Sequence, residues 1–181
     1  MSSAHRLLPH YTYNDYIRWE GAWELVEGLP YAMSPLPTVR HQDLSGNLYL
    51  LFRKALKKAA CTCKVFLPID YKVSDETVLQ PDLLITCKDI LGQKFITERP
   101  ELVVEVLSSS TAMKDLNTKF LIYQEQGVPY YLIVDPEKEL LEIHELQEGV
   151  YQRRFSGAHG NFEFKLGGHC VIALDIADIW E

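Results

Sequence analysis

At 181 residues the chain has the length of one domain, and a hydrophobic content of 47% is enough to build a core. No segment approaches the roughly 20 apolar residues that span a bilayer, and residues 1–10 lack the charged start and apolar stretch of a signal peptide. We therefore expect one domain over 1–181, cytoplasmic and without a membrane partner. The formal net charge of −7 argues against strong non-specific attraction to nucleic acid, because that attraction needs a concentrated basic surface.

The N-terminal half of the chain predicts short strands around one long helix. Thr12 is a suitable N-cap for a first helix, and Gly28 permits a tight turn between two strands. In the long helix, leucines form one apolar stripe, and lysines cluster at the C-terminal end, where the helix dipole favours them. The predicted elements are a helix over 12–19, strands over 23–27 and 29–33, a helix over 39–60 and a strand over 63–73.

The C-terminal half predicts more strand, with one further helix. Serines and a threonine at 108–111 supply N-caps for this helix, and Gly127 is well placed to end it. The predicted elements are a strand over 81–86, a polar connection over 87–100, a strand over 102–107, a helix ending at 126, a strand over 130–134, a hairpin of 140–146 with 150–155, and strand with a closing turn over 162–180. The pattern predicts an α/β domain with a mixed sheet flanked by helices and with additional antiparallel hairpins, rather than a doubly wound nucleotide-binding fold.

The four cysteines do not have the paired spacing that builds a zinc knuckle, and nothing in the sequence indicates secretion. Cys61 and Cys63 are two residues apart on a predicted strand, so they project from one face, where packing is favoured over a partial metal site. We therefore expect Cys61, Cys63, Cys87 and Cys170 to be reduced thiols.

A carboxylate interrupts the most apolar strand of the chain. Glu105 lies within Leu102-Val103-Val104-Glu105-Val106-Leu107, a run typical of a strand that is covered on both faces. Because an isolated buried carboxylate is very unfavourable, the surroundings must supply a counter-ion. The structural alternative is that Glu105 lies on an exposed edge strand, but apolar residues on both faces of this segment do not favour it.

Two further residues are candidates to join Glu105. Asp82 enters the strand that begins with Gln80-Pro81-Asp82-Leu83, and Lys119 lies on a helical stripe of Ala112, Leu116, Lys119 and Tyr123, whose spacings of three and four place them on one face. The structural alternatives are a turn acid for Asp82, and for Lys119 either a side chain that reaches water or a pair with Asp115.

Two carboxylates and one ammonium suit phosphodiester chemistry. Carboxylate oxygens bind Mg²⁺ or Mn²⁺, and the ion lowers the pKa of a bound water and offsets charge that grows on a phosphate. A nearby ammonium orients that water or stabilises the transition state electrostatically. The constellation therefore predicts in-line hydrolysis of a phosphodiester.

Several short motifs follow one another along most of the chain. They are Trp23-Glu24-Leu25-Val26-Glu27-Gly28, then Met33-Ser34-Pro35 with His41, Gln80-Pro81-Asp82-Leu83, Leu102-Val103-Val104-Glu105-Val106-Leu107-Ser108, Asp115 with Lys119 and Tyr123, and Gly127-Val128-Pro129-Tyr130-Tyr131. Together they resemble the Uma-type restriction endonuclease family, within the PD-(D/E)XK nuclease superfamily. Each piece is short, but their order and spacing make accidental agreement improbable.

The resemblance implies a restriction-endonuclease-like fold with a metal site. By this resemblance Asp82 and Glu105 bind the metal, and Lys119 takes over from the helix the role of a lysine usually placed two residues after the acid. Glu24 is implied as a further acid near the metal. His41 matches a histidine of the family, and both a catalytic role and a structural role at the helix start are compatible with its position.

Our hypothesis from the sequence is a Mg²⁺-dependent or Mn²⁺-dependent endonuclease that hydrolyses DNA. Because cutting two strands favours two sites, we expect a homodimer. One alternative is a non-catalytic interaction protein that keeps the fold, which the acidic charge favours; another is a phosphodiesterase that acts on RNA or small nucleotides. Sequence preference and cleavage pattern are not predicted, because base-reading side chains lie on loops that one sequence does not identify.

Overall fold

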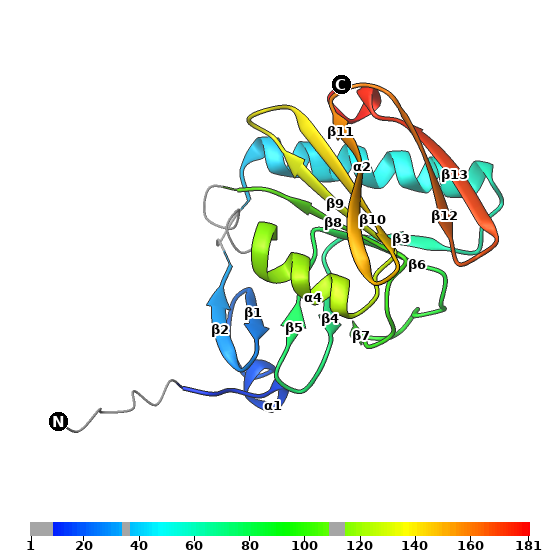
Figure 1. Ribbon diagram of the computed structural model, residues 1–181. Coiled ribbons are helices and arrows are strands. Elements are labelled where there is room, and N and C mark those ends of the chain that lie inside the picture. The colour runs from blue at the N-terminus through cyan, green and yellow to red at the C-terminus, as the bar shows by residue number, and fades with distance from the viewer. Residues whose placement is uncertain (1–8, 34–36, 109–114) are drawn as a thin grey trace.

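The computed structural model describes residues 9–33, 37–108 and 115–181, and its largest element is a six-stranded sheet with the order β11-β10-β9-β8-β6-β3 (Figure 1). Its strands are β3 (Lys64–Phe66), β6 (Leu83–Thr86), β8 (Leu102–Val106), β9 (Tyr130–Asp135), β10 (Leu140–Gln147) and β11 (Val150–Gly157). Strands β8 and β9 are parallel, and the other neighbours are antiparallel. The sheet is mixed, as the sequence predicted, and the predicted hairpin is β10 with β11.

A second, five-stranded sheet has the order β2-β1-β5-β4-β7. Its strands are β1 (Trp23–Val26), β2 (Leu29–Ala32), β4 (Asp70–Lys72), β5 (Val78–Leu79) and β7 (Phe95–Ile96). The prediction of one strand over 63–73 is wrong, because β3 and β4 belong to different sheets. Pro68 lies between them and has no N–H to donate to a strand ladder. The connection expected over 87–100 contains β7, which the sequence did not predict.

The helices begin and end close to the predicted residues, except at the N-terminus. They are α1 (Tyr13–Tyr16), α2 (Val39–Lys58), a π-helical turn (Asp115–Lys119) that continues into α4 (Phe120–Glu125), and a 3-10 turn (Ala177–Ile179). The first helix ends before the predicted residue 19. The Thr38 hydroxyl accepts a hydrogen bond from the N–H of His41 at 3.2 Å and so caps α2. Gly127 follows α4 with a φ of 71°, which favours glycine and ends the helix as expected.

The N-caps expected at 109–111, and Ala112, lie outside the described residues. Among the helices that the structure describes, none combines the length and apolar character needed to cross a bilayer.

Helices α2 and α4 cover opposite faces of the larger sheet (Figure 1). Leu48 and Phe52 of α2 are in one buried cluster with Val104, whereas Tyr123 of α4 is in a second buried cluster with Val103. Neighbouring residues of one strand point to opposite faces, which is why β8 serves both clusters. The hairpin of β12 (Asn161–Leu166) and β13 (Cys170–Asp175) completes the α2 face.

The expectation of reduced thiols is wrong, because the cysteines are paired. Cys61 is bonded to Cys170, which ties the end of α2 to the β12–β13 hairpin, and Cys63 is bonded to Cys87, which ties the residues beside β3 and β6 together. The partners are 109 and 24 residues apart in the chain, so the local spacing of the cysteines carried no sign of the pairing. The fold alone brings them together.

Candidate functional site

The Glu105 carboxylate lies in the interior of the protein. Strand β8 is between β6 and β9, so the alternative of an exposed edge strand is wrong, and Glu105 is 2% exposed. Its Oε1 atom accepts a hydrogen bond from the Lys119 Nζ at 2.9 Å and one from the Tyr123 hydroxyl at 2.8 Å. The counter-ion that the apolar run requires is therefore an ammonium from the helix on the α4 face.

Lys119 joins two strands that belong to different sheets. Besides Glu105 on β8, its Nζ contacts the Oε1 of Glu24 on β1 at 2.8 Å. The side chains of Glu24 and Lys119 are 0% and 2% exposed, so the alternative of a lysine that reaches water is wrong. The same Glu24 oxygen accepts the backbone N–H of Gln80 at 2.9 Å. A buried ammonium between two buried carboxylates has the neutralising partners that burial of charge requires.

Asp82 is partly exposed and contacts strand β8 and helix α2. It occupies the bend directly before β6, and its Oδ2 accepts the backbone N–H of Val106 at 2.8 Å. Leu83, the residue after Asp82, is the register partner of Val104, the residue before Glu105. The two carboxylates therefore come from neighbouring segments of the chain, Asp82 from the bend before β6 and Glu105 from β8.

His41 brings helix α2 to the same carboxylate. Its Nε2 is 3.3 Å from the Asp82 Oδ2, and the two side chains are 14% and 16% exposed. The position of His41 in the first turn of α2 is fixed by the Thr38 cap, and its carbonyl oxygen accepts the Ser45 hydroxyl at 2.8 Å. His41 thus has a structural place at the helix start and also contacts a candidate site residue.

Two residues that sequence reasoning gave no role take part in the network. Burial raises the pKa of Tyr123 well above its ordinary value, and the charges of Glu105 and Glu24 add to this effect, so the phenol stays a hydrogen-bond donor. Gln80 donates its side-chain amide to the Asp70 Oδ1 at 3.0 Å, in addition to its backbone bond to Glu24. The spacing of four between Lys119 and Tyr123 was the available signal for the tyrosine, whereas Gln80 acts mainly through its backbone.

The donor set fits a hard divalent cation. The three carboxylates of Glu24, Asp82 and Glu105 with the ammonium of Lys119 have a formal charge of minus two, which one such cation neutralises. In the described ranges no three His, Cys, Asp or Glu side chains are close enough together to hold a metal by themselves. Mg²⁺ usually keeps several waters and binds through one or two carboxylates together with substrate phosphates, so two carboxylates such as those of Asp82 and Glu105 would be enough on the protein's side.

Comparisons with known proteins point to nucleases. The model of the Uma2 family, described as "Putative restriction endonuclease", matches residues 13–163. Among solved structures, a protein from Anabaena variabilis ATCC 29413 described as "a putative nuclease belonging to DUF820" has a TM-score of 0.73 at 15% sequence identity. The match covers 93% of this chain and 97% of that one. No curated protein matches the sequence. At this identity the structural likeness establishes the fold alone, an α/β domain with a mixed sheet flanked by helices.

Proposed function

The chain belongs to the Uma2 family of restriction endonuclease-like proteins, and from this premise we propose that it is a Mg²⁺-dependent endonuclease that hydrolyses DNA phosphodiester bonds. The observation that carries the proposal is the position of the Lys119 Nζ, 2.8 Å from Glu24 and 2.9 Å from Glu105. Asp82, whose side chain is 16% exposed, lies just before β6 and accepts a hydrogen bond from Val106 of β8, the strand that contains Glu105. Metal-assisted hydrolysis needs a carboxylate that solvent and substrate can reach, here Asp82, together with a second carboxylate and a cationic side chain, here Glu105 and Lys119.

Asp82 and Glu105 are the proposed ligands of Mg²⁺ or Mn²⁺. When bound, the ion would supply a water of lowered pKa and offset the charge of the phosphate. The Val106 N–H and His41 orient the Asp82 carboxylate, and Tyr123 orients Glu105. These contacts hold both carboxylates in place before any ligand arrives, which reduces the cost of ordering them.

Lys119 is the proposed catalytic cation. Its ammonium is held in one position by two carboxylates in an environment from which water is largely excluded, so it is oriented before a phosphate binds. Glu24 contacts Lys119 and the backbone of Gln80, so we assign it the role of a positioning residue that supports the lysine. Position 107, two residues after Glu105, is a leucine, and the helix therefore supplies the base.

The rival proposal is a scaffold that keeps the fold without catalysis. Its support is the formal net charge of −7 and the fact that a buried ion pair can serve folding alone. A third candidate, hydrolysis of RNA or small nucleotides, uses the same groups. We also propose that residues 1–181 form one domain and act as a homodimer, since two sites suit cleavage of two strands.

Cleavage of supercoiled plasmid DNA in Mg²⁺ or Mn²⁺ tests the proposal. The wild type is expected to nick or linearise the plasmid, and chelation with EDTA is expected to stop this. Asp82→Ala and Glu105→Gln are each expected to lower the rate at least 100-fold, because each removes a ligand of the ion. Asp178→Ala, in an exposed acid of the C-terminal turn, is the matched control and is expected to keep full activity.

Two further measurements separate the rivals. Calorimetric titration with Mn²⁺ is expected to show binding to the wild type that Glu105→Gln abolishes, whereas a scaffold shows no such loss. Equal plasmid cleavage by the wild type and Asp82→Ala would identify a contaminating nuclease and contradict the proposal. Cleavage of a single-stranded RNA but not of DNA would replace the DNA assignment by the third candidate.

A further inference from the structure

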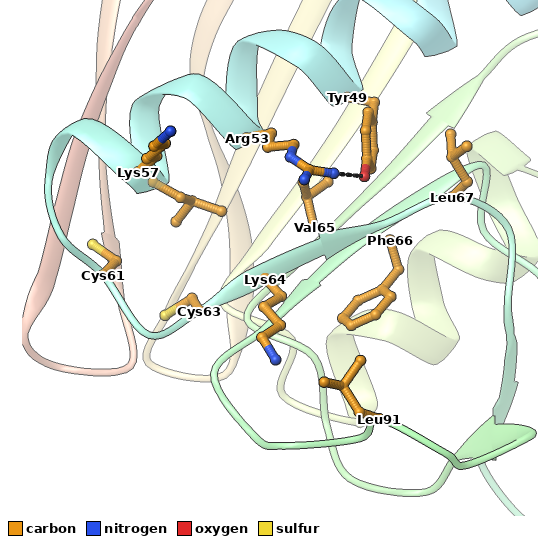
Figure 2. A pocket seen from close by; sticks show the side chains of 11 residues that line it. Tyr49, Arg53, Lys57, Cys61, Cys63, Lys64, Val65, Phe66, Leu67 and Leu91 are labelled. Atoms are coloured by element: carbon orange, nitrogen blue, oxygen red, sulfur yellow. Dashed lines mark hydrogen bonds between the residues drawn. The ribbon is translucent and has the colours of Figure 1, made fainter.

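A groove of about 570 Å³ lies between helix α2 and the outermost strand β3 (Figure 2). Helix α2 supplies Tyr49, Arg53 and Lys57 to its lining, and the segment of β3 supplies Lys64, Phe66 and Leu67. Strand β3 ends the order of the six-stranded sheet, so the groove follows an edge of the molecule's main sheet. None of the candidate site residues lines it.

The groove is basic in an acidic protein. Arg53, Lys57 and Lys64 are exposed, and none of the eleven lining residues is an acid, although the whole chain has a formal net charge of −7. Within the described residues Arg53 and Lys57 form no ion pair with a carboxylate, and Arg53 donates to the Tyr49 hydroxyl at 2.7 Å. The pair of Lys64 with Asp89 spans 3.9 Å between exposed side chains, which is weak. These cations are available to an anionic ligand.

The rest of the lining is apolar and aromatic. Leu67 and Leu91 are 48% and 67% exposed, and Tyr49 and Phe66 add ring surface. A DNA duplex presents mainly phosphates and sugars to a protein groove, so it would leave these side chains uncovered. A single strand presents phosphates and unstacked bases together, and bases stack on aromatic side chains beside a basic track.

Helix α2 extends from the candidate site, where it supplies His41, to the groove, where it supplies Tyr49, Arg53 and Lys57. His41, Ser45, Tyr49, Arg53 and Lys57 follow one another at intervals of four residues and so form one ridge of the helix. At about 1.5 Å of rise per residue, Tyr49 lies about 12 Å and Lys57 about 24 Å along the helix axis from His41. At the other wall, Phe66 is the register partner of Leu84, which lies two residues after Asp82.

We propose that this groove binds a single-stranded segment of the DNA substrate and leads it to the site at Asp82 and Glu105. Arg53, Lys57 and Lys64 contact its phosphates, and Tyr49 and Phe66 receive its bases. The identity of the strand as DNA rests on the proposed function, whereas the binding of a single strand in the groove rests on its charge and lining. The phosphates of the strand supply the negative charge that the groove lacks.

A protein strand is a poorer occupant of this edge. Strand β3 contains three residues, one of them the exposed Lys64, and Pro68 follows within two residues of its end. Short edges with lysine and proline are the devices by which sheets resist further strand pairing. A second copy of the chain is also a poorer occupant, because two chains of net charge −7 repel each other. Only acidic side chains placed directly in the groove would be attracted by its lining.

Fluorescence anisotropy with a labelled single-stranded oligodeoxynucleotide, in EDTA so that no cleavage occurs, tests the proposal. The double variant R53Q/K57Q is expected to weaken binding about tenfold at low salt. Its plot of log affinity against log salt should be shallower by about 1.4, since each lost phosphate contact on a single strand contributes about 0.7. The matched control is K54Q/K58Q, which removes the same charge from the same helix one residue along, outside the groove.

The outcomes separate this inference from the proposed function. If both double variants weakened strand binding equally, the effect would be one of general charge and the groove proposal would be wrong. Tighter binding of the matching duplex than of the single strand would also contradict it. A change of oligomeric state in R53Q/K57Q alone, measured by sedimentation, would assign the groove to a second copy and overturn it as well. Loss of strand binding in R53Q/K57Q in a protein that never cleaves DNA would support the groove while the nuclease proposal fails.

Discussion

The two faces of the six-stranded sheet are built from different chemistry. On the α2 face the buried cluster is apolar and includes Leu48 and Phe52, and both disulfides have a cysteine in it. On the α4 face Tyr123 belongs to the apolar cluster and donates a hydrogen bond to the buried Glu105, which also accepts one from Lys119. Burial of an apolar side chain stabilises the fold wherever it packs, whereas a buried charge needs its partner. The α2 face therefore provides stability, and the α4 face holds charged groups in a fixed arrangement.

The largest effect on stability is expected from Lys119→Met. The substitution keeps most of the side-chain volume but leaves Glu24 and Glu105 buried without their counter-ion, which costs about 3–5 kcal/mol when one partner of a buried pair is removed. Urea unfolding measures this loss. Lys138→Met, whose lysine is 73% exposed and pairs with Asp135 in a turn, is the control and is expected to change stability by less than about 0.5 kcal/mol. Equal stability of the two variants would contradict the claim that the α4 face depends on the ion pairs of Lys119.

On the α2 face, Leu48→Ala is expected to cost about 2–5 kcal/mol. Leu48 is 0% exposed, so its truncation removes apolar burial and leaves a cavity. Because this face does not contribute the proposed ligands, Mn²⁺ binding by the folded variant is expected to match the wild type in a calorimetric titration. Leu50→Ala, in an exposed leucine of the same helix, is the control for helix propensity. A weaker Mn²⁺ affinity in Leu48→Ala would show that the two faces are coupled.

Reduction of the disulfides is expected to lower the free energy of unfolding by about 2–4 kcal/mol, the usual range for loops of this kind. Both bonds connect residues of the α2 face, so thermal unfolding with and without reductant reports on that face. The variant C61S/C170S removes only the bond that closes the longer loop of 109 residues. The charged network on the α4 face should persist, and unchanged Mn²⁺ binding after reduction is the check. An unchanged melting temperature would contradict the stabilising role.

The sequence predicted the elements that a regular pattern defines. The apolar stripe of α2 and the run around Glu105 gave correct positions, because both reflect burial within one segment. The separation of β3 from β4 was not predicted, because membership of a sheet depends on distant partners. The disulfide pairs were not predicted for the same reason, because their partners are 24 and 109 residues apart in the chain.

For the candidate site, the sequence supplied residue types and the fold supplied their distances. Glu105 was recognisable from its apolar neighbours, and Asp82 and Lys119 from a strand entry and a helical stripe, whereas Glu24 was named only through the resemblance to a family. That one ammonium touches both glutamates follows from the approach of β1 to β8, which no local pattern contains. The contact of Asp82 with His41 likewise depends on how α2 lies against the start of β6.

The smallest effect concerns tyrosines on the α4 face at alkaline pH. Burial raises the pKa of Tyr71 to about 12, and Tyr71 is 1% exposed. An unfolded tyrosine loses its proton near pH 10, so between about pH 10 and 12 the unfolded state binds fewer protons than the folded state. The stability that Tyr71 contributes is therefore complete below pH 10 and is lost as the pH rises through about 12, with a slope of about 1 kcal/mol per pH unit.

Urea unfolding at several pH values between 9 and 12 measures this slope, and Tyr71→Phe is expected to make it shallower, because phenylalanine has no proton to lose. The control is Tyr31→Phe, in an exposed tyrosine of β2, which is expected to leave the slope unchanged. Tyr123 and Tyr151, also buried on this face, have raised pKa values for the same first cause and keep part of the slope in the variant. If Tyr71→Phe and Tyr31→Phe had equal slopes, the alkaline sensitivity would not come from burial on the α4 face, and the contrast between the faces would rest on Lys119 and its two carboxylates alone.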